Sequence, residues 1–86
     1  MNINVLIAII KKKLLEKINI ESIKIEDKSF LHKNHPGNEH GKFHLKITLK
    51  SFELKKLSRL ESNKKIYKIL DEEIRKFVHS IQILII

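Results

Sequence analysis

Lys42 to Lys50 reads Lys-Phe-His-Leu-Lys-Ile-Thr-Leu-Lys, and apolar and polar residues alternate through it without a break. Side chains of a β-strand point to opposite faces with a period of two, so the pattern predicts a strand with one apolar and one water-facing row. His44 belongs to the water-facing row, where we expect it to be solvated and inert. The apolar row needs a cover on one side only, and a short chain can supply that cover from its amphipathic segments. We therefore predict an α+β fold with helices packed on one face of a small sheet centred here.

Amphipathic helices are predicted on both sides of this strand. The first runs over about Ile3 to Lys17, where apolar residues form one helical stripe. The second begins at Ser58, because Ser58 and Glu61 have the spacing of a capping box. Asn63 lies on the apolar side of the second helix, and we interpret it as a structural residue that needs a hydrogen-bond partner or a place at the rim. The predicted apolar side of this helix consists of Leu60, Ile66, Tyr67, Leu70, Ile74 and Phe77.

Two further strands complete the pattern. Ile23 and Ile25 alternate with polar residues as a first strand, and Val78 to Ile86 is a nearly continuous β-branched run typical of a last strand. His79 lies at the start of that strand, and its alternation predicts that it shares a face with Ile81, Ile83 and Ile85. The turn-rich loop 27–41 contains His32, His35 and His40 and returns the chain antiparallel, whereas 51–57 has no clear pattern. The predicted order is helix, strand, strand, helix, strand.

Composition limits the possible functions. Eighty-six residues make one domain, and the absence of cysteine excludes disulfides, thiolate metal sites and cysteine nucleophiles within this chain. The net charge of +8 favours a nucleic-acid partner, but sixteen of the eighteen basic residues are lysine, as a coding bias would also produce. A stripe of Lys64, Lys68 and Arg75 is interrupted by Asp71, so we interpret it as a solvated face.

The apolar run 3–10 is too short for a membrane span and lacks the flanks of a signal peptide, so we expect a cytoplasmic protein with no membrane partner. No paired carboxylates, nucleophile with a base, or phosphate-binding loop stands out. We therefore expect a protein that is not an enzyme.

The order and spacing of several short motifs resemble the BolA family. The stretch Ile25-Glu-Asp27-Lys-Ser29 with His32 soon after it, Phe43 at the opening of the alternating strand, and Val78-His79-Ser80-Ile81 are similar to family motifs. So are Leu60 and the helical run 66–74. The resemblance covers nearly the whole chain as a single domain, 1–86, and implies a fold like the second type of KH domain.

The chain departs from the family pattern in three places. Ser62-Asn63-Lys64 replaces an arginine-histidine-arginine run, Leu54-Lys55-Lys56 stands where the family has a phenylalanine-x-glycine turn, and the family's tryptophan-containing segment after the last strand has no counterpart.

The resemblance implies a function in iron-sulfur chemistry. Members of the family, monomeric alone, pair with monothiol glutaredoxins and share a two-iron two-sulfur cluster, whose thiolates come from the glutaredoxin and glutathione. The BolA-like chain supplies histidines, which map onto His79 and His32, with His35 and His40 as substitutes. The alternative without metal binding is that His79 is a hydrogen-bonded residue at a strand end and that the loop histidines are solvated. We expect the shared cluster to serve iron-sulfur trafficking or iron sensing, because a histidine ligand raises a cluster's potential and makes it sensitive to protonation.

DNA binding with a regulatory outcome is the alternative function. It is suggested by the charge and the KH-like architecture, and it has been proposed for the family. KH domains clamp the nucleic-acid backbone with a Gly-x-x-Gly loop, whereas the two glycines here, Gly37 and Gly41, have a different spacing.

Overall fold

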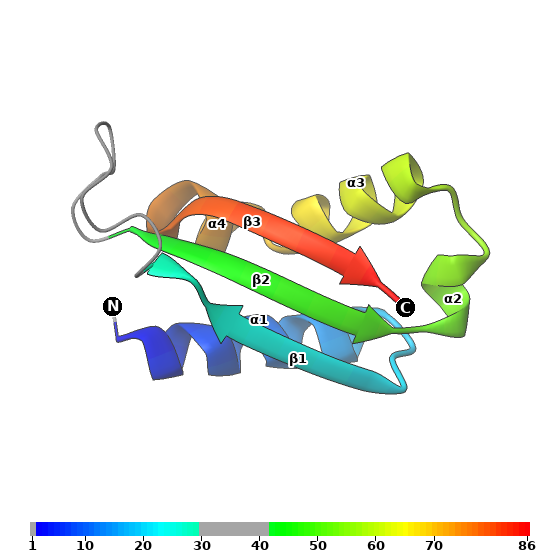
Figure 1. The fold of residues 1–86 in the computed structure, drawn as a ribbon, viewed down its shortest axis with the longest axis horizontal. Coiled ribbons are helices and arrows are strands. Elements are labelled where there is room, and N and C mark those ends of the chain that lie inside the picture. Colours follow the sequence, from blue (N-terminus) through cyan, green and yellow to red (C-terminus); the bar gives the residue numbers. More distant parts are fainter. Residues whose placement is uncertain (1, 30–41) are drawn as a thin grey trace.

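The structure is a computed structural model that describes residues 2–29 and 42–86. Its elements in chain order are α1 (Ile3–Lys17), β1 (Ser22–Asp27), β2 (Phe43–Lys50), α2 (Phe52–Lys55), α3 (Arg59–Ile69), α4 (Asp71–Phe77) and β3 (Val78–Ile85). Figure 1 shows α1, α3 and α4 on one side of a three-stranded sheet whose other side is open. The predicted α+β fold class and element order are confirmed.

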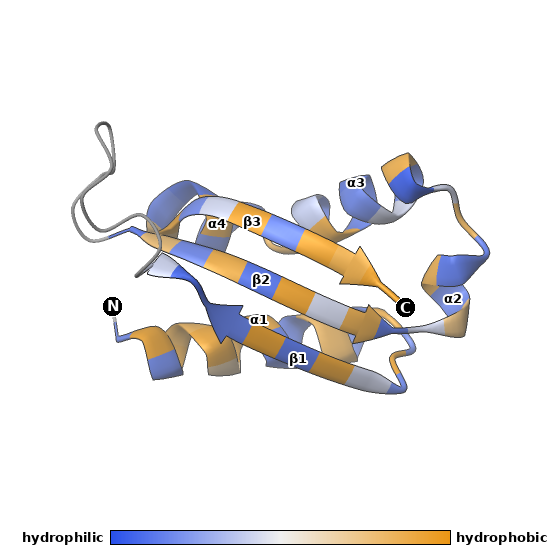
Figure 2. Ribbon diagram, in the orientation of Figure 1, coloured by the Kyte–Doolittle hydropathy of each residue, from blue (hydrophilic) through white to orange (hydrophobic). Residues whose placement is uncertain are grey.

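β2 is the central strand, as its alternating sequence predicts. The sheet order is β1-β2-β3; β1 pairs with β2 antiparallel and β3 pairs with β2 parallel. Ile47, in the middle of β2, is opposite Ile25 on one side and Ile83 on the other. In Figure 2 hydrophobic and hydrophilic colours alternate along β1 and β2, whereas the last part of β3 is hydrophobic without a break. β1 and β3 are therefore the two edges of the sheet.

The core lies between the sheet and the helices. Leu45, Ile47 and Leu49 of β2 are buried against the apolar stripe of α1, and Ile47 and Leu49 have no exposed surface. The helix starts where predicted, because the Asn2 side chain accepts a hydrogen bond from the amide of Asn4 at 2.7 Å and thereby caps the first turn. The remaining buried apolar residues of this cluster are Leu6, Ile10, Leu14, Ile18, Leu54, Ile66, Leu70 and Val78.

The second helical region is divided into three short helices. The unassigned segment after β2 contains α2, which Ser51 caps. α3 begins after Ser58 as predicted, with the Ser58 hydroxyl accepting from the amide of Glu61 at 3.1 Å. The helix is interrupted at Leu70, whose backbone (φ −99°, ψ 16°) lies outside the helical region, and α4 follows. The Leu70 side chain is fully buried, so the change of direction between α3 and α4 occurs at a core residue.

The predicted apolar face of this helix was wrong at two positions. Leu60 and Tyr67 are 63% and 41% exposed, whereas Ser62 is buried. Ser62, Ile66 and Leu70 recur every four residues and form the buried stripe, and Leu60 lies on the opposite side of the helix. The sequence did not indicate this buried stripe, because a small polar residue such as Ser62 is usually expected at the surface.

An ion pair joins α1 to α4. Lys13 Nζ lies 2.6 Å from an oxygen of Glu73, whose side chain is nearly buried, so the pair crosses the rim of the core. The hydrogen bond from Lys13 to Glu73 raises the pKa of Lys13 above its usual value. Within residues 2–29 and 42–86, no helix is both long and apolar enough to cross a membrane.

Candidate functional site at the start of β3

His79 occupies an irregular position at the start of β3. Phe43 of β2 is opposite Val78, but the next residue of β2, His44, is opposite Ser80, so the register shifts by one residue and His79 has no counterpart. One extra residue in a strand bends it locally and redirects its side chain. Simple alternation therefore fails here: Val78 is buried, whereas both His79 and Ser80 are exposed. The shift leaves the His79 imidazole at the surface.

His44 is buried rather than solvated, which corrects the sequence-based expectation. Only 5% of its surface is exposed. Its Nδ1 lies 2.6 Å from the Ser80 hydroxyl, and its ring centroid lies 4.8 Å from that of His79, with the two rings tilted by 60°. The alternating pattern assigns His44 to the correct face of β2. It does not indicate that His79 and Ser80 of the neighbouring strand cover the His44 side chain on that face.

The backbone of His44 is fixed from the other side by the end of β1. Its amide donates to the Ser29 hydroxyl at 3.0 Å, and the amide of Ser29 donates in turn to the Asp27 carboxylate at 2.9 Å. We call Asp27, Ser29, His44, His79 and Ser80 the histidine corner. The Asp27-x-Ser29 motif therefore has a local structural role, since it anchors the start of β2 under the ring that supports His79.

A depression of about 440 Å³ lies beside the histidine corner, lined by Lys28, His44, Leu45, Lys46, Ser80, Ile81 and Gln82. Lys28 Nζ lies 3.0 Å from Glu26, and this hydrogen bond lowers the pKa of the Glu26 carboxyl below its usual value. Glu26 thus stays ionised and offsets part of the lysine charge. The lining of this depression is mainly polar and includes two lysines.

The donor set limits which metal group fits this corner. In the part of the chain that the structure describes, no group of three or more histidine, cysteine or acidic side chains is placed to hold a metal ion. The corner itself offers one exposed imidazole, and a cysteine-free chain has no thiolate to add. A cluster that needs several strong ligands therefore fits only if most of them come from elsewhere.

The three loop histidines, His32, His35 and His40, lie outside the described residues. The segment that carries them begins after Ser29, which belongs to the histidine corner, and leads into β2 just before His44. The stripe of Lys64, Lys68 and Arg75 is exposed, as predicted, and Arg75 pairs with Asp71 at 3.0 Å. Asn63 is half-buried at the rim of a pocket between α3 and β3.

Comparisons with known proteins agree with the resemblance. Residues 14–86 match a family model described as BolA-like protein. A curated relative from Haemophilus influenzae, named DNA-binding transcriptional regulator BolA, is 27% identical over 73 residues, which cover 85% of this chain and 68% of the relative.

Solved structures match the fold. The BolA domain of SufE1 from Arabidopsis thaliana superposes with a TM-score of 0.75 at 22% identity, covering 91% of this chain and 86% of that one. BolA1 from Mus musculus gives a TM-score of 0.74 at 22% identity, covering 92% of this chain and 62% of the mouse chain.

Proposed function

The chain belongs to the BolA family of BolA-like proteins, and we propose that it binds a monothiol glutaredoxin and shares a two-iron two-sulfur cluster with it, for iron-sulfur trafficking or iron sensing. The observation that carries this proposal is the exposed His79 imidazole, set at a register shift and packed against a buried, hydrogen-bonded His44. A metal-binding imidazole needs an open nitrogen and a fixed ring.

The five residues of the histidine corner share three tasks in this proposal. His79 donates a nitrogen lone pair, His44 and Ser80 orient the ring, and Asp27 with Ser29 holds the strand beneath them. The second ligand of the chain is His32, with His35 and His40 as substitutes. The cluster would bring redox activity, and its thiolates would come from glutaredoxin and glutathione, since this chain has none.

The proposal is tested by mixing the protein with a cluster-loaded monothiol glutaredoxin and recording visible absorption and circular dichroism. We expect a changed spectrum with wild type and its loss with His79→Ala. Leu84→Ala, an exposed change at the far end of the same strand and outside the depression, is the matched control and should behave as wild type. Single alanine variants of His32, His35 and His40 then identify the second ligand. An unchanged spectrum with the wild-type protein would refute cluster sharing.

His44→Phe separates a ligand from a positioning residue. Phenylalanine keeps an aromatic ring against His79 but removes both nitrogens, so the complex should form with a shifted dichroism signal instead of being lost. If His44→Phe abolishes the signal as completely as His79→Ala does, His44 is itself a ligand and the assignment of its role is wrong.

DNA binding is a second candidate, favoured by one observation besides the name of the Haemophilus influenzae relative. Lys56 and Lys64 are exposed near the α2–α3 corner, and neither has an acidic partner within the described residues. Unpaired lysines are available to phosphates. A salt titration of DNA affinity with Lys56→Gln and Lys64→Gln tests this: each change should flatten the salt slope by about one charge. Equal affinity for DNA of unrelated sequences would show that binding is nonspecific attraction between the lysines and the phosphates.

A further inference from the structure

β3 forms an edge of the sheet that lacks the usual protection. Natural edge strands discourage pairing with charged residues, and β1 follows this rule with Lys24 and Glu26. β3 carries no lysine, arginine or acidic residue between Val78 and Ile86, and its last part is aliphatic. Leu84 and Ile86 remain 37% and 50% exposed. The composition of this end of β3 therefore favours hydrogen-bonded pairing with a further strand.

The backbone polarity of β3 indicates which groups are open. The amide of Ile86 donates to the carbonyl of Leu49 at 2.8 Å, so residue 86 directs its hydrogen-bonding groups toward β2. Successive residues of a parallel strand alternate in direction, so Ile83 and Ile85 direct their N–H and C=O groups outward. The outward carbonyl of Ile81 fits this alternation, because the Tyr67 hydroxyl donates to it at 3.5 Å.

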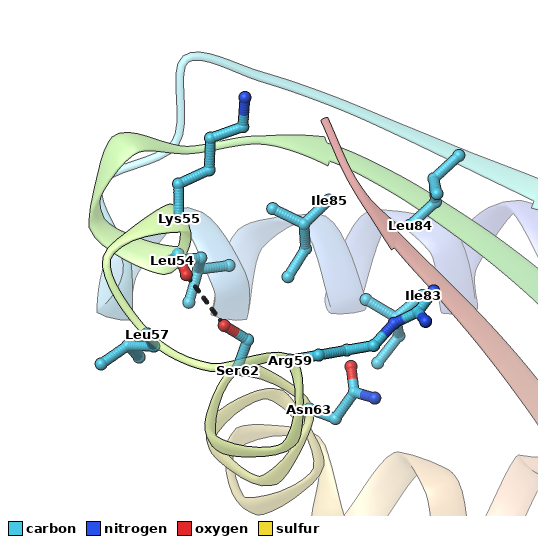
Figure 3. A pocket seen from close by; sticks show the side chains of 9 residues that line it. All are labelled: Leu54, Lys55, Leu57, Arg59, Ser62, Asn63, Ile83, Leu84 and Ile85. Carbon is cyan, nitrogen blue, oxygen red and sulfur yellow. Dashed lines mark hydrogen bonds between the residues drawn. The ribbon is translucent and has the colours of Figure 1, made fainter.

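A pocket of about 280 Å³ adjoins these outward groups, between β3 and the α2–α3 corner (Figure 3). Leu54, Leu57, Ile83 and Ile85 give it apolar walls. The Ser62 hydroxyl is already engaged, since it donates to the Leu54 carbonyl at 2.9 Å. The size and the aliphatic lining suit one side chain of the leucine or isoleucine class.

The polar rim of the pocket is cationic. Arg59 extends from the start of α3 across to β3, with its guanidinium beside Ile83 and the Asn63 amide below it (Figure 3). Arg59 makes no ion pair, and the Asn63 amide no hydrogen bond, with any residue in the described ranges. A guanidinium presents a planar fork of donors that matches a carboxylate. The rim thus favours an acidic side chain next to the apolar one.

From the unprotected edge, its outward backbone groups, the apolar pocket and the cationic rim, we infer that the end of β3 is a docking site for an extended acidic-apolar peptide segment of a partner protein. The segment adds a strand to the sheet through Ile83 and Ile85, inserts an aliphatic side chain into the pocket, and presents a carboxylate two residues away to Arg59. A second copy of this chain is a poor occupant, because each copy carries a charge of +8 and β3 has no acidic residue to offer Arg59. This inference does not depend on the iron-sulfur proposal.

The test uses two blocked heptapeptides, acetyl-Ser-Thr-Leu-Thr-Glu-Thr-Ser-amide and its reverse, so that a parallel and an antiparallel strand are both presented. We expect one of them to bind in an NMR titration and to slow amide hydrogen exchange at Ile83 and Ile85. Replacing the peptide's glutamate by glutamine, or Arg59 by glutamine, should weaken binding by about threefold to tenfold. Arg75→Gln removes the same charge on α4, away from the pocket, and should leave the affinity unchanged.

Other outcomes overturn the inference. Binding that survives N-methylation of alternate peptide amides is not strand pairing. Equal losses for Arg59→Gln and Arg75→Gln indicate attraction to net charge alone. If neither peptide binds while sedimentation equilibrium detects a dimer that Leu84→Lys dissociates, the occupant of this edge is a second copy.

Discussion

Ser51 is the residue whose removal we expect to reveal most about the corner between β2 and α2. Its side chain is fully buried and its hydroxyl makes two hydrogen bonds: it accepts from the amide of Leu54 at 3.2 Å and donates to the carbonyl of Asn19 at 2.7 Å. The first bond caps α2, and the second ties the α1–β1 connection to the same corner. Ser51→Ala breaks both without creating a large cavity.

The loss can be worked out from these two bonds. A lost serine cap costs about 1 kcal/mol, and a lost hydrogen bond to a carbonyl costs about 1 kcal/mol more. The sum of about 2 kcal/mol is a large part of the stability of about 4 to 13 kcal/mol typical of a chain of this length. It corresponds to a fall in Tm of about 8 to 16 °C.

Urea unfolding followed by far-UV circular dichroism measures this difference. Ser58→Ala is the matched control, because Ser58 is exposed and its hydroxyl makes, among the described residues, only the capping bond to the amide of Glu61. We expect this change to cost about 1 kcal/mol. An equal loss in the two variants would refute the assignment of a second hydrogen bond to Ser51. Because α2 provides Leu54 to the pocket, Ser51→Ala should also weaken peptide binding there.

Three other predictions concern burial and pH. Ser62→Ala should lower the free energy of unfolding by about 1 kcal/mol, since it removes a buried hydrogen bond to the Leu54 carbonyl, which keeps the amide of Leu57 as its other donor. Asn63→Ala should change the free energy of unfolding by less than about 0.5 kcal/mol. A reversed order in urea unfolding would contradict the observed burial. Ile47→Ala should cost about 2 to 5 kcal/mol, and Leu60→Ala less than about 0.5 kcal/mol, in thermal melts; similar losses would place Leu60 in the core. The pKa values of three glutamates are lowered by hydrogen bonds from lysines: Glu26, Glu53 and Glu72. The unfolded chain then binds more protons, so stability should be lost as the pH falls below the usual glutamate value of about 4.5. A urea midpoint that is constant from about pH 7 to about pH 3 would contradict these three interactions.

The sequence predicted those elements whose periodicity is local. β2 alternates without a break and α1 carries an uninterrupted apolar stripe, so the buried face of each element can be predicted from its own residues. The buried face of α3 was predicted wrongly because it includes Ser62, whose hydrogen-bond partner is a backbone carbonyl of a different helix. The interruption at Leu70 follows from tertiary packing and has no glycine or proline to announce it.

The candidate site was predictable only in part for a related reason. Resemblance to the family selected His79, but the register shift that exposes it is a property of how β3 pairs with β2. Likewise, the burial of His44 depends on Ser80 and His79, both distant in sequence. Interactions between neighbouring strands do not appear in the pattern of either strand alone.

The cluster-sharing and peptide-docking proposals use opposite ends of β3. From His79 to Ile85 there are six residue steps, which span about 20 Å at the usual rise of a strand. A peptide paired with Ile83 and Ile85 therefore does not cover the histidine corner, and a glutaredoxin bound at His79 does not need the pocket beside Arg59. Because β3 is continuously paired with β2 from Ser80 to Ile85, the strand between the two ends is held in register. We therefore expect His79→Ala to leave peptide affinity unchanged and Arg59→Gln to leave the glutaredoxin signal unchanged. A loss in either cross-test would show that one partner surface extends along the whole edge of β3.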